Sequence, residues 1–212
     1  MMKKLLTLIL LISQLSFSQV EKDNYKLYTL ILNQHLELGN KTKKEKIVLI
    51  EKLENFDNNI EFLDHKSDTI TQLDLDMLYS MTHKDSVFIK RVSKEGDLRN
   101  VIIELTSYRS DHPKIKSELL KKKSIEIQTI TNKIFNSFFR SNRRIEKSWK
   151  RIKKKYGTQK VIGFSKVNYN GQFATIYYSI NCGSLCGSGN IVVFEIINKK
   201  WQILTEINLW MS

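Results

Sequence analysis

Residues 161–209 read VIGFSKVNYNGQFATIYYSINCGSLCGSGNIVVFEIINKKWQILTEINL, and this stretch decides the fold. Apolar and polar residues alternate in four segments, at 161–167, 173–180, 191–197 and 201–209. A period of two is typical of strands with one buried face. The connections are short, and Asn170-Gly171 is a strong signal for a hairpin turn. The stretch therefore predicts a four-stranded antiparallel meander.

The segment before the meander, about residues 132–156, has a helical period instead. One stripe carries its apolar side chains, and Gly157 is expected to end the helix; the stripe comprises Phe135, Phe138, Ile145, Trp149, Ile152 and Tyr156. Because a sheet must bury its apolar face, we expect this long amphipathic helix to lie across the meander. The predicted fold class is therefore α+β.

The N-terminal half is predicted to be helical and mixed, and to complete the core. Helical spacing of apolar residues favours helices at 23–36 and 71–81. Runs of branched residues favour strands at 47–50, 101–106 and 125–129. No linker or repeat separates the halves, so we expect one domain over 19–212, with a mixed part (19–116) and a helix-plus-sheet part (117–212).

Residues 1–18 have the three parts of a secretory signal peptide. Lys3 and Lys4 precede a short apolar run, and Ser16 and Ser18 provide small residues before the expected cut. The apolar run is about eight residues, whereas a membrane-spanning helix needs roughly 20. We therefore expect a protein that is exported to the periplasm or secreted, with no transmembrane segment after cleavage.

Positive charge is concentrated in one segment. Without residues 1–18 the net charge is +11, and residues 140–155 carry +8 of it, with Glu146 as their only acid. Four of the seven arginines lie here. A solvated helix face would explain the pattern; the alternative is an anion-binding surface, because guanidinium groups suit phosphate and carboxylate. The candidate residues are Arg140, Arg143, Arg144, Lys147, Arg151 and Lys154.

The two cysteines, Cys182 and Cys186, lie between the second and third strands of the meander. In an exported protein two cysteines so close together most simply form a structural disulfide. A redox-active pair is the alternative, although the spacing is not that of thioredoxin-like motifs. A metal site is disfavoured, because two thiolates need further ligands and no histidine is near in the sequence.

No catalytic motif is recognisable, and no cofactor or metal ligand set is predicted. Asp64, Asp85 and Asp111 lie within two residues of a histidine, but sequence adjacency does not make a catalytic pair; the four histidines are His35, His65, His83 and His112. His35 is expected to be a packing residue at the edge of its helix. A carboxylate pair assembled by the fold would leave no sequence signature.

The C-terminal third resembles an uncharacterised family of small exported bacterial proteins. The likeness rests on Tyr156-Gly157, Gly163-Phe164-Ser165, the motif Cys182-Gly183 with Leu185-Cys186-Gly187, Lys200-Trp201 and the terminal Trp210-Met211-Ser212. This resemblance supports the domain prediction and implies no activity.

The preferred function is therefore an exported, non-enzymatic binding or accessory protein of the cell envelope. One alternative is a polyanion binder that uses the basic helix to contact an anionic envelope polymer or lipid headgroups. The other is an exported hydrolase whose carboxylate or histidine-acid site is hidden in the fold.

Overall fold

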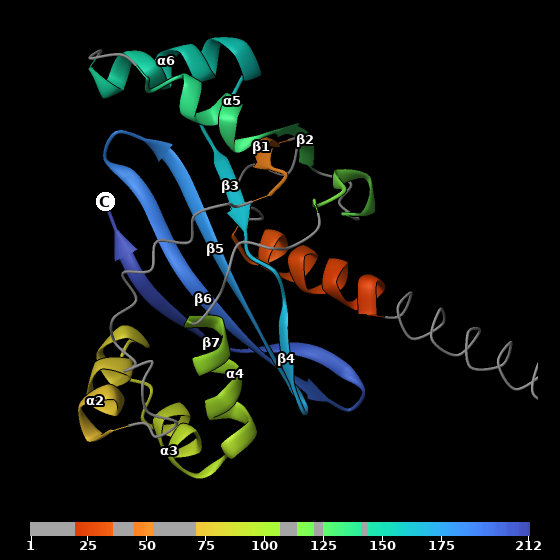
Figure 1. Cartoon of the computed structure of the whole chain (residues 1–212), viewed down its shortest axis with the longest axis vertical. Coiled ribbons are helices and arrows are strands. Elements are labelled where there is room, and N and C mark those ends of the chain that lie inside the picture. The colour runs from red at the N-terminus through yellow and green to blue at the C-terminus, as the bar shows by residue number, and fades with distance from the viewer. Residues whose placement is uncertain (1–19, 36–44, 53–70, 107–113, 121–124, 141–143) are drawn as a thin grey trace, which may run out of the picture.

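The computed structural model describes residues 20–35, 45–52, 71–106, 114–120, 125–140 and 144–212. Their centre is a seven-stranded sheet with strand order β2-β1-β3-β5-β6-β7, in which β4 pairs with β5 (Figure 1). Its strands are β1 (Glu45–Ile50), β2 (Ile125–Ile130), β3 (Val161–Phe164), β4 (Asn168–Asn170), β5 (Phe173–Gly183), β6 (Cys186–Ile197) and β7 (Lys200–Met211). The predicted signal peptide lies outside the described residues.

The C-terminal meander is confirmed. β3 pairs antiparallel with β5, β5 with β6, and β6 with β7. The turn from β6 to β7 is Asn198-Lys199, and both residues have positive φ, of 51° and 62°. A type I′ turn requires this conformation at both central residues, because its twist matches that of the flanking strands. Local alternation and turn chemistry therefore determine this half of the sheet.

The strands at 47–50 and 125–129 are also confirmed, but their pairing was not predicted. β1 lies parallel to β2 on one side and parallel to β3 on the other. Val48, Leu49 and Ile50 are all buried, although successive residues of a strand face opposite sides of the sheet. A continuous apolar run of this kind is typical of a parallel strand covered on both faces. The meander is thus the antiparallel part of a mixed sheet.

Helix 20–35 covers one face of the sheet. Its Leu27, Tyr28, Ile31 and Leu32 form a core cluster with alternate strand residues, including Ile47, Leu49, Ile162, Phe164, Ile176, Tyr178, Val192 and Phe194. The 3₁₀ turn η1 (Ser117–Leu119) lies between Ile115 and Leu120, which join the same cluster. The predicted N-terminal helix is therefore confirmed as a core element of this face.

Three helices cover the opposite face over β5, β6 and β7: α2 (Gln72–Met81), α3 (Ser86–Lys94) and α4 (Gly96–Thr106). α2 confirms the helix predicted at 71–81. The strand predicted at 101–106 is wrong, because these residues form the second half of α4. Leu98, Val101 and Ile102 are fully buried at helical spacing, and the Thr175 hydroxyl donates to the Val101 carbonyl. Packing against the sheet overrides the β propensity of the branched residues.

The single long helix predicted at 132–156 is wrong in its continuity. The structure has two helices, α5 (Asn132–Ser137) and α6 (Ile145–Tyr156). The Ser148 hydroxyl donates to the Phe138 carbonyl at 2.7 Å, whereas ten residues of continuous helix would separate these positions by about 15 Å. The break allows Phe135 and Phe139 to pack on Trp149, with ring centroids 6.2 and 5.5 Å away.

The fold class is α+β, with adjacent C-terminal antiparallel strands, as predicted. Trp149, Ile152 and Tyr156 face the sheet as expected, but Ile145 is 55% exposed. α6 covers mainly the parallel part, because its cluster contains Val48, Ile50, Ile130 and Val161. Figure 1 shows α5 and α6 at one end of the sheet and α2–α4 at the other. In the part of the chain described, no helix has the length and apolar character needed to cross a bilayer.

Candidate functional site

The basic surface predicted from the sequence lies on the solvent side of α6. Four of this helix's residues are buried against the sheet: Ser148, Trp149, Ile152 and Tyr156. Apart from Ile145 and Glu146, the remaining positions of α6 are basic, and these cations and the N-cap Arg144 are all exposed: Arg144, Lys147, Lys150, Arg151, Lys153, Lys154 and Lys155. The 3.6-residue period of an apolar stripe therefore places the charges outward.

Most of the predicted anion-binding residues belong to one row. Arg144, Lys147, Arg151 and Lys154 are spaced by three or four residues, so they lie along one side of the helix over about 15 Å. We call these four residues the α6 basic row. Arg140 is exposed just after α5, and Arg143 lies outside the described residues. Five of the six candidates are thus placed on exposed surface.

The ring of Phe138, the residue directly after α5, contacts two cations of α6. The guanidinium carbon of Arg151 lies 5.7 Å from the Phe138 ring centroid, and the Lys155 amine lies 5.8 Å from the same ring. Lys155 is also 5.2 Å from the Tyr156 ring. Stacking on an aromatic face leaves the N–H edge of a guanidinium free to donate. Arg151 is therefore held in place without losing its capacity to bind an oxyanion.

The α6 basic row has no acidic partner among the described residues. Some cations elsewhere are paired, such as Lys26 with Asp23 at 2.6 Å and Lys116 with Glu21 at 3.2 Å. Like charges three or four residues apart destabilise a helix by about 0.2–0.5 kcal/mol per pair. Arg144 and Lys147 also lie at the helix N-terminus, where the dipole disfavours cations. These two positions therefore carry charge that helix stability does not explain.

A second polar cluster joins three segments distant in the sequence. The Tyr178 hydroxyl donates to the Glu206 carboxylate and lies 2.8 Å from His35 Nε2, which is 3.3 Å from the second Glu206 oxygen. Because the single hydroxyl proton goes to Glu206, His35 must carry its proton on Nε2 in this arrangement. His35, at the end of helix 20–35, is therefore hydrogen-bonded to residues of the sheet. The sequence predicted only a packing role for it.

The cluster shifts the protonation of two of its members. Burial raises the pKa of Tyr178, and its hydrogen bond to Glu206 raises it further. Burial also tends to raise the pKa of Glu206, but hydrogen bonds from His35 and Tyr178 outweigh it and hold this pKa below its ordinary value of 4.5. Glu206 is thus stabilised as an anion.

Replacing Glu206 with glutamine is expected to lower the free energy of unfolding by about 2 kcal/mol at pH 7, the worth of hydrogen bonds to a charged group. A depressed folded-state pKa contributes stability above pH 4.5, which is lost as pH falls through the folded value. The difference between wild type and Glu206→Gln should therefore shrink towards pH 3. Urea unfolding at several pH values measures it, with exposed Glu118→Gln as the control. An undiminished difference at pH 3 would contradict the assignment.

The other histidines form no such cluster in the described residues. His83 is exposed in the turn after α2, and neighbouring Asp85 instead accepts from the Val87 and Phe88 amides as the N-cap of α3. His65 and His112 lie outside the described residues. No group of three or more potential metal ligands occurs in the part of the chain that is described.

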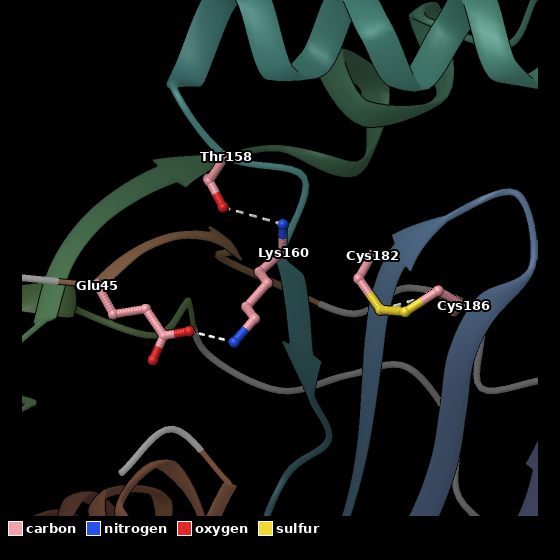
Figure 2. The surroundings of a disulfide bond; sticks show 5 residues. All are labelled: Glu45, Thr158, Lys160, Cys182 and Cys186. Atoms are coloured by element: carbon pink, nitrogen blue, oxygen red, sulfur yellow. Dashed lines mark hydrogen bonds and ion pairs between the residues drawn. A yellow bond between two sulfur atoms is a disulfide. The ribbon is translucent and has the colours of Figure 1, made fainter. Parts of the chain in front are cut away.

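Cys182 and Cys186 form the predicted disulfide, with Cα atoms 5.1 Å apart. Figure 2 shows the bond at the adjoining ends of β5 and β6, with β3 beside it and Lys160, just before β3, directed towards Glu45. The predicted loop is largely strand, because Gly183 pairs with Cys186 and only Ser184 and Leu185 form the turn. The disulfide therefore closes the end of the hairpin.

The glycines of this hairpin have a packing role. A Cβ atom at Gly189 would lie 2.0 Å from Trp210 Nε1 and 2.7 Å from the Tyr177 hydroxyl. Trp210 donates to that hydroxyl at 3.2 Å and so lies across the glycine. A Cβ atom at Gly187 would lie 3.2 Å from the Trp210 ring, which is a tight contact but not an overlap. The Gly-rich segment therefore makes room for the C-terminal tryptophan, which explains its glycines without a bound anion.

No protein-family model, curated protein or solved structure matches this chain. The disulfide hairpin on which the resemblance to small exported bacterial proteins partly rests is present, but no family match supports the resemblance itself.

Proposed function

We propose that this protein is an exported, non-enzymatic binding module that holds a linear anionic polymer of the cell envelope against the α6 basic row. The observation that carries the proposal is that the cations of the α6 basic row are exposed and have no acidic partner among the described residues. Four cations follow one helix side, the opposite side is buried, and no described acid neutralises them. A row of fixed, uncompensated cations attracts a polyanion and releases its counterions on binding.

The geometry favours a polymer over a membrane surface. A helix that lies in a membrane interface needs an apolar face to bury among the lipids. The apolar face of α6 is already occupied, because Trp149, Ile152 and Tyr156 are at most 8% exposed. Ile145 is the one apolar side chain of α6 that is exposed. A row about 15 Å long instead suits successive charges along an extended chain.

Two sequence features support an envelope location. Residues 1–18 have the pattern of a secretory signal peptide, and the hairpin disulfide is of the kind that persists in oxidising compartments. The polymers available there carry phosphate, sulfate or carboxylate groups. Arg144 and Arg151 would bind such oxyanions through paired N–H donors, and Lys147 and Lys154 would act as point charges.

The hydrolase alternative is less well supported. The fold does assemble a histidine-acid pair, His35 with Glu206, which sequence alone did not predict. However, His35, Glu206 and Tyr178 satisfy one another, and among the described residues no serine or cysteine is hydrogen-bonded to His35. A satisfied cluster of this kind is typical of a structural role. Binding therefore remains the preferred class.

The test is heparin affinity, measured calorimetrically as a function of salt concentration. The variant Arg144→Gln/Lys147→Gln/Arg151→Gln/Lys154→Gln removes the α6 basic row and keeps good helix formers. Removing four cation contacts should lower the slope of log K against log salt by about 3, and weaken binding on the order of 100-fold at 0.1 M salt.

The matched control is Lys84→Gln/Lys90→Gln/Lys94→Gln/Lys166→Gln, which removes the same charge from exposed positions elsewhere. It should retain most of the affinity and most of the salt slope. Equal losses in the two variants would show that only net charge matters, and would overturn the proposal. Stronger binding to vesicles with 30% anionic lipid than to heparin would also overturn it, in favour of a membrane contact.

A further inference from the structure

A cleft of about 910 Å³ lies between helix 20–35 and the hairpin formed by β6 and β7. It is separate from α6, because Figure 1 shows the turn between β6 and β7 far from α6, at the other end of these strands. Its size falls within the range of about 300–1,000 Å³ that is usual for small-molecule sites. It is lined by apolar and aromatic side chains together with several lysines.

The apolar part of the cleft lining includes large side chains that are partly exposed to solvent. Leu119 and Ile196 line the cleft and are 39% and 38% exposed, and Leu30 and Trp201 lie beside them. Burying such surface is worth roughly 25 cal/mol per Å². A ligand with an aliphatic portion would therefore gain affinity by covering these side chains.

Hydrogen bonds and ring contacts hold the aromatic residues of the cleft in place. The Trp201 ring lies 5.7 Å from the Tyr169 ring, and the Tyr169 hydroxyl donates to Asn24 on helix 20–35 at 2.6 Å. Tyr25 accepts a hydrogen bond from the Lys116 amide at 2.8 Å. These contacts tie the helix to the hairpin and to the segment before η1. The cleft is therefore formed before any ligand enters, which reduces the entropy lost on binding.

The charged side chains around the cleft differ in whether they have an ion-pair partner. Its two carboxylates are already paired, Glu21 with Lys116 and Asp23 with Lys26. Lys22, Lys199 and Lys200 also line the cleft, are exposed, and have no ion-pair partner among the described residues. The available charge is therefore positive, and it borders apolar surface.

Lys199 occupies a position that glycine would fill with less strain. Its φ of 62° lies in the left-handed region, which costs an L residue with a side chain roughly 1–2 kcal/mol. The second central position of a type I′ turn is usually glycine for this reason. The turn therefore places a charged side chain beside the cleft at some cost to local stability.

We propose that this cleft binds a single-chain amphiphile with a carboxylate head, such as a long-chain fatty acid. The aliphatic chain would cover Leu30, Leu119 and Trp201, and the carboxylate would lie among Lys22, Lys199 and Lys200. A carboxylate is favoured over a phosphate because Glu21 and Asp23 lie nearby and would repel a dianion more strongly. The apolar side chains of the cleft thus favour an aliphatic chain, and the neighbouring lysines and carboxylates favour a head group with a single negative charge.

The test is calorimetric titration with dodecanoate and with dodecanol, its neutral counterpart. Wild type should bind dodecanoate saturably at one site, and dodecanol at least 10-fold more weakly. The variant Lys22→Gln/Lys199→Gln/Lys200→Gln should bind dodecanoate at least 10-fold more weakly than wild type. Thr29→Trp, which fills the cleft from the helix side, should abolish binding while circular dichroism shows a folded protein.

The matched control is Lys150→Gln/Lys153→Gln/Lys154→Gln, which removes the same charge from α6 and should bind dodecanoate like wild type. This control also separates the cleft from the polymer-binding proposal. No saturable binding by wild type, equal binding of the acid and the alcohol, or unaltered binding by Thr29→Trp would each overturn the inference. Preferential binding of a lysophospholipid with a phosphate head would overturn the carboxylate assignment.

Discussion

Replacing Trp149 with alanine is expected to lower the free energy of unfolding by about 4 kcal/mol, a large part of the stability of an ordinary domain. Trp149 is 5% exposed and packs against Phe135 and Phe139 as well as the parallel strands. Its removal leaves a cavity where α5, α6 and the sheet meet. Urea unfolding followed by far-ultraviolet circular dichroism measures the loss.

Ile145→Ala is the matched control, because Ile145 belongs to the same helix and the same predicted stripe but is 55% exposed. Its effect should stay within about 0.5 kcal/mol, as for most surface substitutions. If the two variants lost similar stability, the orientation of α6 would be wrong. The α6 basic row would then no longer face solvent, so this experiment also tests the premise of the binding proposal.

Arg91 is the most highly connected cation of the described residues. Its guanidinium donates to both oxygens of Glu95, the residue directly after α3, and to both oxygens of Glu195 on β6, at 2.6–2.9 Å. The group also lies 5.6 Å from the Phe173 ring. The hydrogen bonds that Arg91 donates to Glu195 and Glu95 raise the pKa of Arg91, and Arg91 lowers the pKa of Glu95. This network ties α3 to the sheet.

Arg91→Met is expected to destabilise the protein by about 3 kcal/mol in urea unfolding. The reason is that Glu195, which is only 8% exposed, would keep a buried charge with Gln172 as its remaining hydrogen-bond donor. Lysine should not replace Arg91 fully, because an ammonium group cannot donate in pairs to two carboxylates.

Lys90→Met, on the same helix but exposed and unpaired in the described structure, should change stability by less than about 0.5 kcal/mol. The double variant Arg91→Met/Glu195→Met should be more stable than Arg91→Met alone, because it removes the uncompensated charge. A double variant less stable than Arg91→Met would show that the packing of these side chains matters more than their charge.

The candidate surface could be predicted from sequence because it depends on one helix. The period of Trp149, Ile152 and Tyr156 already implies which side of α6 is buried, so the exposed side with Arg151 and Lys154 follows without knowledge of its partner. The His35 cluster could not be predicted, because its three members come from a helix and two strands far apart in the chain. The cleft likewise depends on where the β6–β7 hairpin lies relative to helix 20–35.

Sequence alone determined the antiparallel strands, their tight turns, the disulfide hairpin and the amphipathic character of α6. Each depends on contacts between residues close in the chain, where side-chain period and turn chemistry act directly. Tertiary structure decided that β1 joins β2 and β3 in parallel, that residues 101–106 are helical, and that the helix predicted at 132–156 is interrupted between α5 and α6. These outcomes depend on which distant surface buries Val101, Phe138 or Val48, and local residue preferences differ by too little free energy to choose among such partners.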